Sequence, residues 1–445
     1  MPEDYPMYPS NKQMVAYFHS YIDHFGLGEC IRNNCKVTDA RPRDGGGWIV
    51  TVEESDPLRP DDAPTVEDHE VDFLVNCAGI CCYERMPSDD AMPGKADFEA
   101  AGGTVIHTYH LNNALLDEVV EKTKERRANE EDKRVRMVVL GFGKSGLDVG
   151  TSVADRDDTY APVHYVYRNP RWFTPEYLWG FLHHRHALYS PFMQVMPPWF
   201  KPSLSERLVY ILSRPITLIF ILLWQFWLKR HFQALGVGIP DTSILSKHPT
   251  CSFFLEPPKF QEQIKEKKLF FHPRNNIASF DKEGVTLKDG TKLGADIVVL
   301  GTGYTADWSW LPEAVREKVI HKDDGYLWLY KHVIHPDLPD MGFVGYQSAF
   351  NSLGCFDVAA SWLASYLKGT VKKESREVML KDLNARKDWY HAWKGTKYMA
   401  PCVAGHEYFF QRDLQKEEGK AYSPLYSSWL CDYFTPKWSH WWARK

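Results

Sequence analysis

The sequence predicts an α/β fold that contains two similar units, and three observations lead to this prediction. A glycine-rich loop at 141–146 follows an apolar, strand-like run and precedes a helix-like segment. A pattern of an acidic residue, an apolar run and a glycine exit occurs at 72–79 and again at 296–303, about 220 residues later. The chain of 445 residues, 44% of them hydrophobic, is long enough for two or three domains with their own cores.

Composition excludes several classes of protein. The 53 basic and 58 acidic residues give a net charge of −5, so no general attraction to nucleic acid is expected. The nine cysteines are scattered without Cys-x-x-Cys or Cys/His spacing, and the His183–His186 cluster lacks Asp or Cys partners, so no metal site is predicted. The thiols are expected to be reduced. The residues after Met1 show neither a basic nor an apolar leader, so secretion is not expected.

The first unit begins with residues 11–26, whose apolar positions have helical spacing. Alternating segments at 35–37 and 48–52 predict strands, and the Asp- and Pro-rich region 55–70 predicts an exposed hairpin loop. A buried, parallel-type strand should then end at Ala78-Gly79. The second copy runs from 280 to 303 and should end in a similar strand with its exit at Gly301-Thr302-Gly303.

The central glycine loop has the pattern G-x-G-x-x-G between strand 135–140 and a helix that opens at Leu147. Gly141 should form the tight turn, Gly143 should let the backbone approach a pyrophosphate, and Gly146 should permit close packing of helix on strand. This context is typical of a Rossmann-like dinucleotide site, to which Lys144 and Ser145 also belong.

The residue that reads the adenosine ribose should end the next strand, 163–167. Arg168 stands there and Arg171 follows, where a carboxylate would bind the 2′-hydroxyl of NAD. Arginine suits a 2′-phosphate, so NADP is predicted over NAD. The alternative is that both arginines are ordinary surface residues.

The stretch 208–228 is strongly apolar and is followed by Lys229-Arg230-His231. Its uncharged part, 215–228, is shorter than the roughly 20 residues that span a bilayer. Three readings stay open: an interfacial or re-entrant segment, a buried core helix, or a true span. The aromatic and basic end, 438–445, either docks on the protein itself or contacts a membrane interface.

Together these motifs resemble the class B flavin-containing monooxygenases. The resemblance also rests on Tyr21-x-x-His24-Phe25-Gly26-Leu27, on Gly103 with His107, and on Gly301-Thr302-Gly303-Tyr304. It implies a discontinuous FAD domain with an inserted NADPH domain. The implied ranges are 1–115 for the first FAD segment, 134–300 for the NADPH domain with an apolar, helical insertion at about 175–260, and 301–445 for the second FAD segment and tail.

The resemblance further implies that NADPH reduces FAD and that a C4a-hydroperoxyflavin then oxygenates a lipophilic substrate at soft nitrogen or sulfur, consuming O₂. Ala78, Gly79 and Gly301 to Tyr304 would lie on the FAD side, and no catalytic side chain is assigned. The 175–260 insertion would form an apolar access route. The expected location is the cytoplasmic side, peripheral on a membrane, which in a eukaryote would be the endoplasmic reticulum.

Two departures from the family pattern affect these expectations. Ala101 and Leu111 replace the aromatic residues that flank Gly103 and His107 in the family's identifying sequence, while Phe98 and Tyr109 stand out of register, so the subclass is open. The chain also holds no second G-x-G-x-x-G to cradle the FAD diphosphate. Three alternatives follow: a chain that lacks upstream residues, a degenerate NADP-binding relative, or another flavoprotein with two dinucleotide domains.

Overall fold

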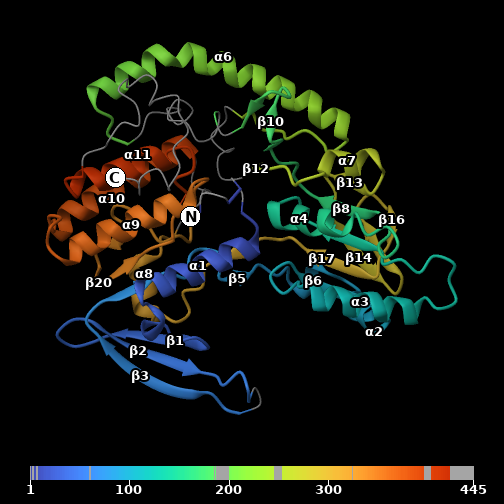
Figure 1. Ribbon diagram of the computed structural model, residues 1–445, viewed down its shortest axis with the longest axis horizontal. Coiled ribbons are helices and arrows are strands. Elements are labelled where there is room, and N and C mark those ends of the chain that lie inside the picture. Colours follow the sequence, from blue (N-terminus) through green and yellow to red (C-terminus); the bar gives the residue numbers. More distant parts are fainter. Residues whose placement is uncertain are drawn as a thin grey trace.

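Two lobes lie side by side beneath one long helix (Figure 1). The computed structural model describes Pro2, Tyr5, Pro6, His186 and residues 9–59, 62–184, 200–244, 253–322, 324–394 and 402–420. The chain passes from one lobe into the other and back. Residues 95–300 supply most of one lobe, called the nucleotide lobe after the predicted dinucleotide site, and residues 35–76 and 334–417 contribute to the second lobe. The expected C-terminal aromatic segment, 438–445, lies outside the described residues.

The nucleotide lobe is built on a five-stranded parallel sheet in the order β13-β8-β7-β17-β6. Its strands are β6 (Thr104–His107), β7 (Met137–Leu140), β8 (Val163–Tyr167), β13 (Leu269–Pro273) and β17 (Ile297–Leu300). The helices of this lobe are α2 (Lys95–Ala100), α3 (Asn113–Arg126), α4 (Lys144–Val153) and α7 (Phe260–Lys265). The predicted strand–loop–helix around the glycines is confirmed as β7, residues 141–143 and α4, although the helix begins at Lys144 and not at Leu147.

One strand of this sheet comes from outside the expected range. β6 falls within 1–115 but pairs in register with β17, so the boundary between the two lobes lies before residue 104. Pairing on both edges buries all four residues of β17. The prediction of a buried strand is therefore confirmed for the second copy of the repeat.

The second lobe combines an antiparallel meander with a small mixed sheet. The meander consists of β1 (Cys35–Pro42), β2 (Trp48–Glu54) and β3 (Thr65–Val71); the mixed sheet has the order β19 (Ile334–His335), β20 (Leu338–Phe343) and β4 (Leu74–Asn76). Its helices are α1 (Asn11–Phe25), α8 (Glu313–Val319), α9 (Ser352–Leu367), α10 (Arg376–Lys394) and α11 (Glu407–Glu417). The helix expected at 11–26 is thus confirmed as α1, which Ser10 and Gln13 cap reciprocally.

The expected loop at 55–70 is wrong in its second half, because β3 begins at Thr65. Its acidic side chains find partners across the meander: Arg41 pairs with Asp68 at 2.5 Å and Arg43 with Glu70 at 3.0 Å. A charged segment therefore forms a strand by pairing its side chains with those of its neighbours.

The repeat is confirmed in topology but not in burial. Each copy is a three-stranded meander followed by a parallel strand, with β14 (Ile277–Asp281), β15 (Gly284–Leu287) and β16 (Lys292–Gly294) preceding β17. β4 is not buried, and Val75 at its centre is 39% exposed. Among the described residues β4 has a strand partner on one edge only, β20, whereas β17 has two.

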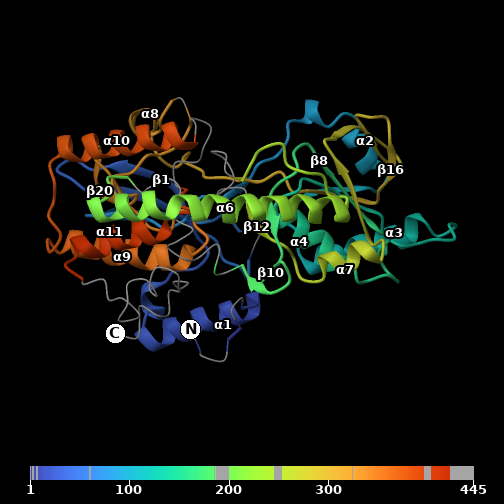
Figure 2. The ribbon, with the colours of Figure 1, turned by 90° about the horizontal axis from the view of Figure 1, so that it is seen from above.

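The apolar stretch 208–228 lies within one continuous helix, α6 (Leu204–Leu235), which passes through Pro215. Viewed from above, it crosses both lobes (Figure 2). Leu228 and Phe232 pack into the core of the nucleotide lobe, and Tyr210 packs against that of the second lobe. Three short ladders complete the fold: β5 (Tyr83–Glu84) with β18 (Tyr304–Thr305), β9 (Phe173–Thr174) with β12 (Phe254–Leu255), and β10 (Tyr177–Leu178) with β11 (Leu182–His183).

Candidate functional site: two pockets joined by one ladder

The glycine loop has the geometry that its sequence predicts. Gly141 has φ +120°, and a Cβ there would lie 2.3 Å from the carbonyl oxygen of Gly301, so only glycine fits this turn. A Cβ on Gly146 would come within 3.1 Å of the Gly141 oxygen, which confirms that this residue lets α4 approach β7 closely. A Cβ on Gly143 would meet nothing within 4 Å. The open space is in front of Gly143, at the N-terminus of α4, where an anion is favoured.

A pocket of about 380 Å³ opens at this loop. It is lined by Arg85, Met86, Pro87, Ala91, Met92, Leu140, Gly141, Phe142, Gly143, Tyr167, Arg168, Asn169, Arg171, Asn276, Ile277, Phe280, Gly301 and Thr302. Among the described residues that line this nucleotide pocket, three are arginines and none carries a carboxylate. Its electrostatic character therefore favours phosphate groups.

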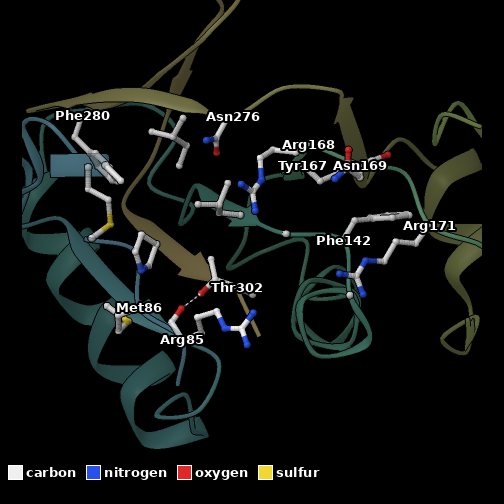
Figure 3. A pocket seen from close by; sticks show the side chains of 18 residues that line it. Arg85, Met86, Phe142, Tyr167, Arg168, Asn169, Arg171, Asn276, Phe280 and Thr302 are labelled. Carbon is white, nitrogen blue, oxygen red and sulfur yellow. Dashed lines mark hydrogen bonds between the residues drawn. The ribbon is translucent and has the colours of Figure 1, made fainter. Parts of the chain in front are cut away.

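Both predicted arginines belong to the nucleotide pocket. Arg168 projects from the end of β8 into the space between Asn276 and Thr302, and Arg171 lies beside Phe142 (Figure 3). Arg168 forms no ion pair with any described carboxylate, so its charge remains available to a ligand. The alternative that these are ordinary surface residues does not account for their convergence with Gly141 and Gly143.

Three further lining residues carry no signal in the sequence. Arg85 is brought in by β5, where its N–H donates to the Gly303 carbonyl at 2.9 Å and its own carbonyl accepts from the Thr302 hydroxyl at 2.7 Å. Asn169 follows Arg168, and Asn276 begins the turn into β14. Long-range pairing places Arg85 and Asn276 here, so no local motif could have identified them.

Other predicted site residues lie behind the loop rather than in the pocket. Lys144 pairs with Asp148 at 2.5 Å along α4. The Tyr304 hydroxyl lies 3.4 Å from the Ser145 hydroxyl and 3.0 Å from that of Thr108. The two hydroxyl contacts of Tyr304 tie the loop to the 301–304 exit, whereas the Lys144–Asp148 pair stays within α4.

His107 contributes to the same support. Its ring packs edge-on against Tyr304 at 5.3 Å, and its Nδ1 accepts from the Tyr109 N–H at 3.0 Å. Burial lowers the pKa of His107 below its ordinary value, so the neutral ring is favoured.

The out-of-register Phe98 is fully buried, and its ring fills the space beside Gly103. A Cβ on Gly103 would lie 2.4 Å from the Phe98 ring. Phe98 therefore packs directly against the Gly103 backbone.

A second pocket, of about 560 Å³, lies beside β4. Its lining is Lys36, Val37, Thr38, Leu74, Val75, Asn76, Cys77, Ala78, Cys82, Tyr83, Tyr109, Asp307, Ser309 and Trp310. This β4 pocket includes the predicted Ala78; Gly79 follows it in the turn, with φ +75°. The β5–β18 ladder connects the two pockets, since Tyr83 faces one and Arg85 the other.

No residue of the 175–260 insertion lines either pocket in the described part of the chain. The expectation of an access route is therefore not met there, because the inward residues of the insertion, such as Trp224 and Phe232, fill the core beside Phe173.

The described residues 9–59, 62–184, 200–244, 253–322, 324–394 and 402–420 contain no group of three His, Cys, Asp or Glu residues suited to a metal. Cys402 is disulfide-bonded, so the expectation of reduced thiols is wrong at that position.

Comparison with known proteins agrees with this arrangement. Residues 264–409 match the family described as FMO-like, flavin-binding monooxygenase-like. Putative flavin-containing monooxygenase 2 of Arabidopsis thaliana is 25% identical over 397 residues, which cover 84% of this chain and 74% of that protein. Flavin-containing monooxygenase 1 of Homo sapiens is 25% identical over 409 residues, or 89% of this chain and 66% of that protein.

The chain is similar to flavin-containing monooxygenases over most of its length. This similarity supports a flavin-dependent monooxygenase, and the chain spans 74% and 66% of the length of these two relatives. The fold agrees: a polycyclic ketone monooxygenase from Thermothelomyces thermophila superposes with a TM-score of 0.63 at 15% identity, covering 93% of this chain and 76% of that one. Cyclohexanone monooxygenase in its rotated conformation gives 0.60 at 16% identity, covering 92% and 83%. At such identities these structures show the fold of the family and not its substrate.

Proposed function

We propose that this chain is a flavin-containing monooxygenase that uses NADPH and FAD to oxygenate lipophilic small molecules at soft nitrogen or sulfur atoms. The observation that carries the NADPH part is the acid-free nucleotide pocket, in which Arg168 and Arg171 converge with Gly141 and Gly143. A carboxylate at the end of β8 would bind the ribose 2′-hydroxyl of NADH. An arginine at that position instead attracts the 2′-phosphate of NADPH. The substrate class rests on the family alone.

The residues of the nucleotide pocket fit NADPH. The backbone N–H groups at the start of α4 would hold the pyrophosphate in the open space at Gly143, and Arg168 and Arg171 would hold the 2′-phosphate. Arg85, on the opposite wall, would neutralise further phosphate charge. Bound NADPH supplies a hydride, and the contribution of this chain is to orient the nucleotide toward the β5–β18 ladder.

The residues of the β4 pocket fit FAD only in part. The cavity is large enough for a ring system, and Tyr83, Tyr109 and Trp310 offer aromatic walls. An FAD diphosphate needs a helix N-terminus or several cations, but among the described lining residues Lys36 is the only cation and no helix begins there. The described residues therefore do not complete an FAD site. This observation favours a second candidate function, an NADP(H)-binding protein that holds no flavin of its own.

Titration of the intact chain with NADPH and NADH tests the nucleotide assignment. NADPH should bind more tightly, and Arg168→Ala should weaken NADPH by about tenfold to a hundredfold, since a charge-assisted contact is worth roughly 1.5–3 kcal/mol. NADH should be little affected. Arg59→Ala, at an exposed loop position in the other lobe, is the control and should bind both nucleotides like the parent chain. Equal affinity of the parent chain for the two nucleotides would refute the assignment.

Visible absorption and NADPH oxidation separate the two candidate functions. The 445-residue chain is expected to purify without stoichiometric flavin, and without FAD it should not consume NADPH. If added FAD binds and NADPH oxidation with O₂ uptake follows, the monooxygenase is supported. If NADPH binds while FAD does not, the second candidate is supported. Stoichiometric FAD in the purified chain would show that its phosphates are held by residues other than those of the β4 pocket.

A further inference from the structure

The outer side of α6 carries a continuous row of exposed apolar side chains. Leu204, Leu208, Ile211, Leu212, Ile216, Ile219, Leu222, Leu223 and Phe226 are each 51–75% exposed. Their spacing of three, four and seven residues places them on one stripe of the helix. The opposite stripe of the helix is buried. Its residues are at most 3% exposed: Ile221, Trp224, Leu228 and Phe232. Single exposed apolar residues are common, but a row of nine on one helix marks an interaction surface.

An aromatic hairpin continues this surface. β10 and β11 are joined by Trp179, Gly180 and Phe181, and Phe181 is 76% exposed. The Trp179 ring contacts Phe220 at 5.5 Å and Trp227 at 6.0 Å, which fixes the hairpin against α6. Trp179 has φ +51°, an unusual conformation for a bulky residue, so the hairpin holds this ring in place at a cost in backbone energy.

The charges around the row select the partner. Within α6 the chain has four Lys or Arg residues, at 207, 214, 229 and 230, and one acidic residue, at 206. Arg207 and Arg230 are exposed near the two ends of the row, and Lys229 lies beside Arg230. The one carboxylate at the base of the hairpin, Glu176, lies 3.6 Å from His183. An apolar stripe bordered by cations and flanked by aromatic rings matches the interface of an anionic lipid bilayer.

Length and composition alone would also permit a span. Residues Arg207–Leu235 form the one described helix long and apolar enough to cross a membrane. Its inner stripe, however, is part of the core of the nucleotide lobe, and that core would have to open before α6 could enter a bilayer end-on. A helix in this position can contact lipid only by lying along the surface.

We propose that α6 and the 177–183 hairpin form a docking surface for an anionic membrane, with α6 lying in the plane of the interface. Apolar side chains from Leu204 to Phe226 would enter the acyl boundary, while Lys229 and Arg230 would contact headgroups. This surface is on the opposite side of the molecule from the β2–β3 hairpin (Figure 1). The proposal is independent of the nucleotide assignment.

Co-sedimentation with lipid vesicles tests it. The intact chain should sediment with vesicles of phosphatidylcholine and phosphatidylserine, and more weakly with phosphatidylcholine alone or at high salt. The triple variant Leu212→Ser, Ile219→Ser, Phe226→Ser should bind at least about tenfold more weakly. Lys229→Gln with Arg230→Gln should lose about fivefold or more, and only on the anionic vesicles.

Leu58→Ser with Val66→Ser is the matched control, since these residues are 88% and 59% exposed but belong to the other lobe. NADPH affinity reports that each variant is folded. The proposal is overturned if the intact chain stays in the supernatant with both kinds of vesicle, or if the triple variant sediments like the parent. It is also overturned if the triple variant binds no less lipid but changes from dimer to monomer without lipid, since a second copy would then cover this face.

Discussion

Individual residues decide how the glycine loop works, and two of its glycines serve different purposes. Gly141 is required by the fold, because its φ is positive and a side chain would overlap the Gly301 carbonyl. Gly143 has φ −99°, which any residue can adopt, and nothing in the protein approaches its Cβ position. Glycine is a favoured N-cap residue, and here it also leaves open the space in which a ligand phosphate would lie.

Alanine substitutions separate these two purposes. Gly141→Ala should destabilise the protein by roughly 2–4 kcal/mol, from backbone strain and overlap with Gly301. Gly143→Ala should lower the unfolding free energy by no more than about 1 kcal/mol, since alanine is a poorer N-cap than glycine, and should still weaken NADPH binding by about tenfold or more. Urea unfolding and nucleotide titration of both variants measure this. If Gly143→Ala binds NADPH normally, the phosphate does not lie at the start of α4.

A histidine pair in the nucleotide lobe predicts an acid-sensitive fold. His164 on β8 and His272 on β13 are neighbours, with His164 Nδ1 3.0 Å from His272 Nε2. Burial, and then the charge of His272, lowers the pKa of His164 to about 4, and burial also lowers the pKa of His272. The unfolded chain, with an ordinary histidine pKa near 6.5, binds protons first. Stability is therefore present above about pH 6.5 and is lost as the pH falls toward 4.

The contribution of His164 should be roughly 2 kcal/mol between pH 7 and pH 5. His164→Gln should reduce that part of the pH dependence of unfolding in urea. His19→Gln, at an exposed position on α1, should leave the pH dependence unchanged. An identical pH profile for His164→Gln and the parent chain would mean that His164 is protonated equally in the folded and unfolded states.

At the scale of elements, one buried carboxylate holds α3, β7 and β17 together. Asp296 is 1% exposed and contacts Arg126 at the end of α3, Arg127 at 3.5 Å and Arg136 at 3.0 Å. Its Oδ2 also accepts the Arg136 backbone N–H at 2.8 Å. The acidic residue that begins the second copy of the repeat is thus a structural anchor, placed where β17 enters the sheet.

Removing its charge should be costly. Asp296→Asn leaves three arginines without their shared partner, so the unfolding free energy should fall by roughly 3–5 kcal/mol. Glu121→Gln removes an exposed pair with Lys124 and should change stability by less than about 1 kcal/mol. Denaturant unfolding of the two variants gives the comparison. A loss for Asp296→Asn no larger than that for Glu121→Gln would rule out the anchoring role.

The elements also show what could be predicted from the sequence. The glycine loop, β8 with Arg168, and the two repeats follow from local patterns, because strand, turn and helix signals there are all within about 30 residues. The strand β3 was hidden, since its side chains are charged and gain their partners from β1 and β2. Arg85 and Asn276 were hidden for the same reason, as only pairing over long sequence distances brings them to the nucleotide pocket.

At the scale of the whole molecule, α6 joins the two lobes and presents its outer stripe away from both. The sequence left three readings of 208–228 open because hydropathy does not show which face of a helix is covered. The structure shows one face in the core and one face exposed. The unequal burial of β4 and β17 is likewise a property of assembly, since their sequences are alike and their numbers of partner strands differ.

The central claim is that the pocket between β8 and the glycine loop recognises the 2′-phosphate of NADP(H). The most direct measurement is the binding of two fragments that differ only in that group, adenosine 2′,5′-bisphosphate and adenosine 5′-monophosphate, to the intact chain by calorimetry. The bisphosphate should bind about tenfold to a hundredfold more tightly, and Arg168→Ala with Arg171→Ala should abolish the difference. Equal affinity for the two fragments in the parent chain would contradict the claim.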